Sequence, residues 1–270
     1  MDISKKYLIE HYNSLQKECA GNASKINNEF KRKDIHNFRV AIKKMNAFKS
    51  FIKFTEPEFE ITEKELEKIY KSAGRLRTLT LLKKGIEDLK LFDKQWKKHF
   101  RNDLKKEKES YSKIYREFEK AWKDKSREQA DKIFFIINEE NKLEESAGKY
   151  INSLFSNINK VSNNIPQTSF HDIRKLMKEF GYNYSLLCEA FYFLTDEKLI
   201  SEINNLNKIL GKWHDRVVLK KFIMKNEFEG RDRIAEQVQM GINTDEDYIQ
   251  NLLNAFTLKN GGAIFLKYLK

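Results

Sequence analysis

Apolar residues recur along most of this chain at intervals of three and four positions, which is the spacing of an amphipathic helix. Clear alternating strands are lacking, and the 270 residues include only two prolines and ten glycines. The pattern therefore predicts an all-α protein. The predicted helices span residues 3–30 (with a possible break near Gly21), 35–55, 62–73, 76–98, 131–161, 170–194, 196–210, 213–229 and 245–258.

Residues 94–130 are densely charged with both signs. We interpret this segment as a long helix or a helical hairpin, with its charges on a solvated face rather than on a binding strip. Aromatic residues are interleaved with the charges, namely Trp96, Phe100, Tyr111, Tyr115, Phe118 and Trp122.

One helical phrase occurs twice, as HNFRVAIKK at 36–44 and as HDIRKLMKE at 171–179. A histidine, an arginine and a lysine recur with the same shift of 135 positions (171 − 36 = 174 − 39 = 178 − 43). Their spacing of i, i+3 and i+7 places them on one helix face. The repeated residues are His36, Arg39 and Lys43 in the first copy, and His171, Arg174 and Lys178 in the second.

An apolar stripe lies opposite each basic row and is expected in the core, namely Phe38, Ala41, Met45 and Ile52 in the first copy and Ile173, Leu176, Phe180 and Leu187 in the second. Apolar residues also flank each row, namely Ile35, Val40, Ile42, Ala47 and Phe51 in the first copy and Phe170, Met177, Tyr182 and Leu186 in the second. A solvated basic face is the usual fate of lysines and arginines on a helix, but it is normally bordered by polar positions. Half-burying the cations requires carboxylate partners or an anionic ligand, because burial without a partner costs several kcal/mol per ion. We therefore expect the two rows to face a common groove, in helices capped by Asp34 and Ser169.

The repetition predicts an internal duplication. We expect two pseudo-symmetric four-helix bundles in tandem, the first over residues 1–130 and the second over residues 131–270.

A second repeated signal follows each row, around Gly74 and around Gly211. We expect each glycine to end a helix, with Thr62 capping the helix before Gly74. A new helix that starts beside cationic residues would bind anions through its free N–H groups, although a plain interhelical turn is the simpler reading.

Composition narrows the class of partner. The net charge is +12, which favours nucleic acid, anionic lipid or condensed phosphate. Cys19 and Cys188 are far apart in the sequence and form no metal-binding motif. We expect both to be buried free thiols of a protein in a reducing compartment. No run of apolar residues has membrane-spanning length and no signal peptide is evident, so we expect a cytoplasmic protein.

At these motifs the chain resembles the CHAD family, the conserved histidine α-helical domain. That family's pattern is a helix with a histidine, an arginine three positions later, and basic residues seven, eight and ten positions later, in both halves. Each half also carries a Leu-Gly-x-x-(Arg or Asn)-Asp turn, represented here around Gly74 and around Leu210 and Gly211. The resemblance covers roughly residues 3–260.

The chain departs from this pattern at several positions. Asn46 and Gly181 replace the basic residue at the tenth step, and Glu179 replaces the second basic residue of the second copy. Thr78 stands for the first turn aspartate, and His214 stands for the usual arginine or asparagine.

The resemblance implies a non-enzymatic helical domain that binds inorganic polyphosphate in a basic groove between its halves, without a metal or cofactor. It also implies possible cooperation in trans with a triphosphate tunnel (CYTH-type) enzyme, and possible association with polyphosphate granules. The implied binding residues are Arg32, His36, Arg39, Lys43, Lys44, Arg77, His171, Arg174, Lys175, Lys178, Tyr182, Lys212, His214 and Arg216.

Two other functions remain open at the level of sequence. A nucleic-acid-binding protein would use the aromatic and basic residues of segment 94–122. A phosphoryl-transfer enzyme would need His36 and His171 to face each other, but the chain carries no phosphate loop and no recognisable Mg²⁺ motif.

Overall fold

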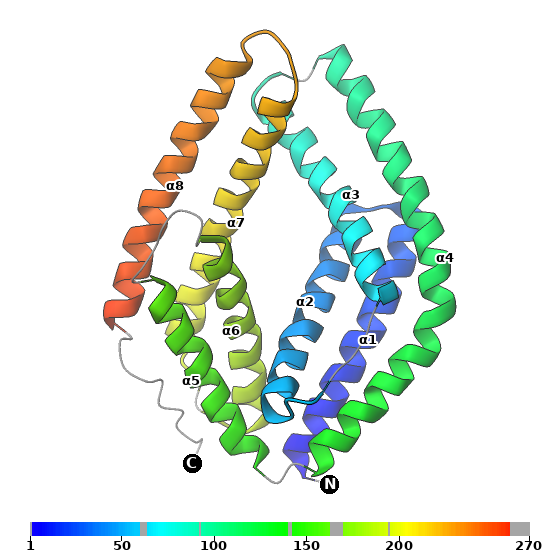
Figure 1. Cartoon of the computed structure of the whole chain (residues 1–270), viewed down its shortest axis with the longest axis vertical. Coiled ribbons are helices and arrows are strands. Elements are labelled where there is room, and N and C mark those ends of the chain that lie inside the picture. Colours follow the sequence, from blue (N-terminus) through cyan, green and yellow to red (C-terminus); the bar gives the residue numbers. More distant parts are fainter. Residues whose placement is uncertain are drawn as a thin grey trace. The chain divides into compact units, whose positions relative to one another are not determined.

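The protein is all-α. A computed structural model describes residues 2–59, 64–91, 93–139, 142–162, 170–193 and 195–259. Those residues form eight helices and no strand (Figure 1), which confirms the predicted all-α class. The helices are α1 (Ile3–Glu29), α2 (Arg32–Thr55), α3 (Lys64–Asp88), α4 (Lys94–Glu139), α5 (Leu143–Ser162), α6 (Phe170–Ala190), α7 (Glu197–Lys225) and α8 (Arg231–Lys259).

The chain divides into two compact units, Met1–Leu143 and Glu144–Lys270. In the first unit, α1 packs against α2 and α4, and α3 packs against the same two helices. In the second unit, α7 packs against α6 and α8, while Phe155 of α5 contacts Phe180 of α6 and Phe256 of α8. The division comes later than the expected boundary after residue 130, because α4 continues to Glu139 and buries Ile133 and Ile137.

Gly74 and Gly211 do not end helices, so this prediction was wrong. Both lie inside continuous helices, α3 and α7. A glycine in a helix interior costs only about 1 kcal/mol relative to alanine. Buried residues on both sides of each glycine offset that cost, such as Leu66 and Leu76 in α3. The possible break near Gly21 is also absent, because α1 is continuous.

Other predicted helix boundaries also moved. The helix predicted over 76–98 is interrupted, since α3 ends at Asp88 and Lys90 adopts a left-handed conformation with φ of 59°. Asp93 then caps α4, its Oδ1 accepting from the N–H of Trp96 at 2.9 Å. Asp34 is not an N-cap but lies in the first turn of α2. The predicted caps Thr62 and Ser169 lie outside the described residues.

α4 is a single helix of 46 residues. Its six interleaved aromatic side chains are each exposed by 9% or less and form part of the core of the first unit. Most of the charged residues between them are exposed, as the sequence predicted. Within the described ranges, none of the helices combines the length and the apolar character that crossing a bilayer requires.

Candidate functional site: two cationic rows

The first row comprises Arg32, His36, Arg39 and Lys43 on α2. Arg32 and His36 are exposed, whereas Arg39 and Lys43 are half-buried. The opposite face of α2 forms core, with Phe38, Ala41, Met45 and Ile52 fully buried. Of the apolar flanks predicted to frame the row, Ile35, Ile42, Ala47 and Phe51 are buried, and Val40 is half-buried. The row is therefore a polar strip bordered by mostly buried apolar residues.

Arg39 is fixed by α3. Its Nη1 donates a hydrogen bond to the backbone oxygen of Tyr70 at 3.0 Å. Its Cζ lies 4.3 Å from the centroid of the Tyr70 ring, within the range of a cation–π contact. Because Tyr70 uses the face of the guanidinium, recognition of an anion by Arg39 would fall to the edge of that group. The sequence analysis did not identify Tyr70 as a site residue. The one feature that could have pointed to it is its position one helical turn before Gly74.

Gly74 makes room for this arginine. A Cβ atom added at Gly74 would lie 2.7 Å from Nη1 of Arg39. The guanidinium can therefore lie against the backbone of α3, because Gly74 has no side chain that would occupy this space. Gly74 therefore allows Arg39 to lie close to the backbone of α3 and does not end the helix. No helix begins here, so the anion-binding helix start that was predicted at this position is absent.

The second row comprises His171, Arg174, Lys175, Lys178 and Tyr182 on α6. His171 and Lys175 are exposed, and the other three are half-buried. The core face of α6 consists of Ile173, Met177, Phe180 and Leu187, all fully buried. Two positions exchange their predicted places, since Leu176 is only half-buried and the predicted flank Met177 belongs to the core.

Two predicted site residues, His171 of α6 and His214 of α7, are brought together. Their rings stack with centroids 5.7 Å apart and an interplanar angle of 24°. Nδ1 of His214 lies 3.6 Å from Oδ1 of Asp215. The region around Gly211 thus contributes to the second row through a side chain on a continuous helix, and not through a helix terminus.

The surroundings of His171 lower its pKa below the ordinary histidine value of 6.5. The main cause of the lowered pKa is partial desolvation of a ring that is still exposed overall. The next causes are electrostatic interactions with Lys175, His214 and Arg174. The carboxylate of Asp172 acts in the opposite direction. These surroundings therefore favour the neutral imidazole, and negative charge placed beside His171 would raise its pKa.

The departures from the CHAD pattern in the second copy have a structural reason. Glu179 accepts a hydrogen bond at 2.7 Å from the hydroxyl of Tyr150, which itself accepts one from Nδ2 of Asn183 at 3.3 Å. A Cβ atom added at Gly181 would lie 3.1 Å from Cγ2 of Ile203. Both positions therefore serve helix packing, whereas in the first unit Asn46 and Thr78 are exposed.

The remaining predicted site residues differ in what they contact. Arg216 is engaged by α8, where its Nη1 donates to the backbone oxygen of Gly241 at 2.9 Å and pairs with Asp245. Lys175 pairs with Asp172 at 3.2 Å. Among the described residues, no ion pair to a carboxylate forms at Arg32, Lys44, Arg77 or Lys212.

The expected groove shared by both rows depends on the placement of the two units and stays a prediction. Across the described part of the chain, no three His, Cys, Asp or Glu side chains cluster in a way that could hold a metal ion. What each row offers is a strip of arginine, lysine and histidine donors. Such donors suit the oxygens of phosphate groups.

Comparison with known proteins agrees with this description. The family model of the CHAD domain matches residues 6–223. A search of curated proteins finds no match. Among solved structures, the chain is similar to the CHAD domain from the plant Ricinus communis, with a TM-score of 0.69 and 11% sequence identity. That match covers 96% of this chain and 89% of the plant chain. The chain therefore belongs to the CHAD-domain family.

Proposed function

We propose that this protein binds inorganic polyphosphate, without catalysis, through the cations of its two rows. The observation that carries the proposal is Arg39, which Tyr70 holds in place at 3.0 Å while Gly74 leaves room for it. A guanidinium that is already ordered loses less conformational entropy when it binds an anion. Membership of the CHAD family supports the same ligand class, because CHAD domains are associated with polyphosphate binding.

The chemistry of the rows fits a chain of phosphates. Arg39 and Arg174 would donate in pairs to phosphate oxygens, whereas Lys43 and Lys178 would act as point charges. The second row adds His171, whose proton affinity rises beside an anion. Repeated donors along a helix match repeated acceptors along a linear polymer, which a single orthophosphate would not use.

Binding of nucleic acid is the weaker alternative, because base stacking needs accessible aromatic rings. The aromatic side chains of α4 that could have stacked on bases are buried. Competition tests the choice: labelled polyphosphate should be displaced by unlabelled polyphosphate at much lower phosphate concentration than by RNA or single-stranded DNA. Displacement by either nucleic acid at equal phosphate concentration would overturn the proposal.

Replacing Gly74 by alanine should lower polyphosphate affinity without unfolding the protein. Alanine should raise the stability of α3 by about 0.5–1 kcal/mol, because glycine is the poorer helix former. The added methyl group must displace the guanidinium of Arg39, the flexible end of a long side chain. Displacing Arg39 also breaks its hydrogen bond to Tyr70, which offsets the gain in helix propensity. We therefore expect a thermal midpoint close to that of the unmodified protein, together with polyphosphate affinity lowered by about tenfold, the equivalent of one charged hydrogen bond.

Gly21→Ala is the matched control for this variant. Gly21 also lies inside a helix, and nothing approaches within 4 Å of the Cβ that would be added there. Because no contact is lost at Gly21, this variant should gain about 0.5–1 kcal/mol of stability and keep full affinity. If both alanine variants bind as tightly as the unmodified protein, the position of Arg39 does not matter for binding.

Polyphosphate affinity should increase as the pH falls from about 8 to about 6. The surroundings of His171 lower its pKa in the free protein, and bound phosphate would raise that pKa. Binding then takes up a proton, so affinity can gain at most about tenfold per pH unit for each proton taken up. Long polyphosphate is the appropriate ligand, since its few terminal groups titrate in the same range.

His171→Gln should flatten this pH profile while leaving most of the affinity at pH 8. His99→Gln is the control, because His99 lies on α4 rather than on α2 or α6 and pairs with Asp103 at 3.4 Å. An unchanged pH profile in His171→Gln would exclude a titrating role for this histidine.

A further inference from the structure

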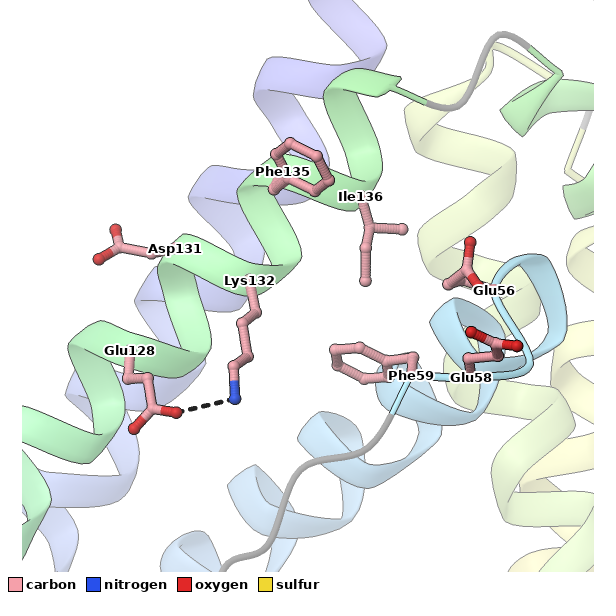
Figure 2. A pocket seen from close by; sticks show the side chains of 8 residues that line it. All are labelled: Glu56, Glu58, Phe59, Glu128, Asp131, Lys132, Phe135 and Ile136. Atoms are coloured by element: carbon pink, nitrogen blue, oxygen red, sulfur yellow. Dashed lines mark hydrogen bonds and ion pairs between the residues drawn. The ribbon is translucent and has the colours of Figure 1, made fainter.

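A groove in the first unit differs in character from the cationic rows. It lies between the last turns of α4 and the segment that follows α2, and Figure 2 shows its lining side chains. Its volume is about 530 Å³. The lining residues are Glu56, Glu58, Phe59, Glu128, Asp131, Lys132, Phe135 and Ile136.

The floor of the groove is apolar and partly open to solvent. Phe59 and Ile136 face each other across it, and Phe59 is almost fully buried. Phe135 is 66% exposed, and the preceding Phe134 is 45% exposed. Phe135 lines the groove, and an exposed phenylalanine beside an apolar floor is typical of an interaction surface rather than of ordinary solvated surface.

The rim of the groove is acidic. Glu56 and Glu58 lie on one side of the groove, and on the α4 side Glu128 points toward it while Asp131 points away from it; all four are exposed. Among the described residues that line the groove, Lys132 is the one cation, and it pairs with Glu128 at 2.8 Å. The lining therefore carries a formal charge of −3 (one lysine against four carboxylates), on a protein whose net charge is +12.

We propose that this groove docks a lysine- or arginine-rich amphipathic segment of a partner protein. An apolar anchor of that segment would cover Phe135 and fill the space above Phe59 and Ile136. Its cations would face the carboxylates on the two sides of the groove. This is the helix-in-groove mode of peptide recognition, with charge providing orientation and the apolar floor providing affinity. The inference is independent of polyphosphate binding, because it uses carboxylates and aromatic rings rather than the cationic rows.

The proposal can be tested with a defined probe. A fluorescein-labelled amphipathic peptide of leucine and lysine, about 14 residues or four helical turns long, is titrated with the full-length protein in the absence of polyphosphate. Fluorescence anisotropy reports binding. A peptide with glutamate in place of each lysine, and one with serine in place of each leucine, should not bind measurably.

Two variants locate the binding surface. Phe135→Ser should weaken binding of the leucine–lysine peptide by about tenfold, because it removes apolar surface that docking would bury. The pair Glu128→Gln and Asp131→Asn should weaken it by about three- to tenfold, since exposed ion pairs are individually weak. Both variants should retain native helix content and native polyphosphate affinity, because these side chains are exposed.

The matched control removes two carboxylates from elsewhere on α4. Glu109 and Glu117 are exposed, and Glu117 pairs with Lys68 at 3.9 Å. Glu109→Gln with Glu117→Gln should leave peptide binding unchanged. Equal weakening by this control would show that the peptide reads only overall charge, and equal binding of the glutamate peptide would also overturn the proposal.

Two further outcomes would replace the proposed occupant. Displacement of the peptide by spermidine at a similar concentration would identify a small polyamine as the ligand. A dimer in light scattering that Phe135→Ser dissociates, in the absence of any peptide, would identify a second copy of this chain.

Discussion

Polyphosphate affinity should fall on the order of a hundredfold when the salt concentration rises from about 50 to about 200 mM, provided that about five phosphates are neutralised. The reason is that each cation bound to a polyanion releases a condensed counterion, and the release is less favourable in concentrated salt. The logarithm of the affinity should therefore decrease linearly with the logarithm of salt concentration. Titrations at four or more salt concentrations would measure the slope.

The slope also counts contacts. With a single-stranded polyanion each phosphate contact contributes about 0.7 to it, so a variant that loses two cations from the rows should show a slope lower by about 1.4. A flat salt response of the unmodified protein, or no binding at the lowest salt, would contradict the proposed function outright.

Replacing Arg39 and Arg174 together by glutamine should produce the largest loss of affinity for any pair of substitutions. Each arginine would lose about 1.5–3 kcal/mol of charged hydrogen bonding, so the pair should weaken binding by on the order of a hundredfold or more. The fold should survive, because the opposite faces of both helices carry the core, with Phe38 and Phe180 fully buried. Circular dichroism and the thermal midpoint check this point.

Arg116→Gln with Arg233→Gln is the matched control, with one exposed arginine in each unit. It removes the same charge and the same residue type from α4 and α8. We expect less than a threefold change, within the usual effect of a distant surface charge. Equal losses in the two pairs would mean that polyphosphate responds to net charge alone. The single variants complete a double-mutant cycle, and non-additive losses would indicate that both rows act on one ligand.

The fold class and the rows themselves could be predicted from sequence. The spacing of apolar residues predicted that α2 and α6 are helices. The residues expected opposite the first row, such as Phe38 and Met45, are fully buried. Such patterns show which face of a helix is buried, and they are reliable because many residues contribute to each face. The repeated His–Arg–Lys spacing could be read for the same reason, because it depends only on helix geometry.

Helix ends and side-chain partners could not be predicted in this way. Gly74 and Gly211 look like stops in the sequence, yet packing along α3 and α7 outweighs the local preference of one residue. The contact of Arg39 with Tyr70 joins positions 31 residues apart, and the stacking of His171 on His214 joins two different helices. Contacts of this kind depend on how helices are placed against each other, which local periodicity does not encode.

The space that Gly74 leaves for Arg39 makes the two positions interdependent in evolution. A lineage that acquires alanine at 74 gains helix stability but displaces the arginine, and after that change the arginine is no longer preserved by its contact with Tyr70. Conversely, once Arg39 is lost, nothing retains a glycine in the middle of α3. Among related sequences the two residues should therefore be gained and lost together. A protein engineer who fills helix glycines to raise thermal stability would select at this position against the binding that the fold supports.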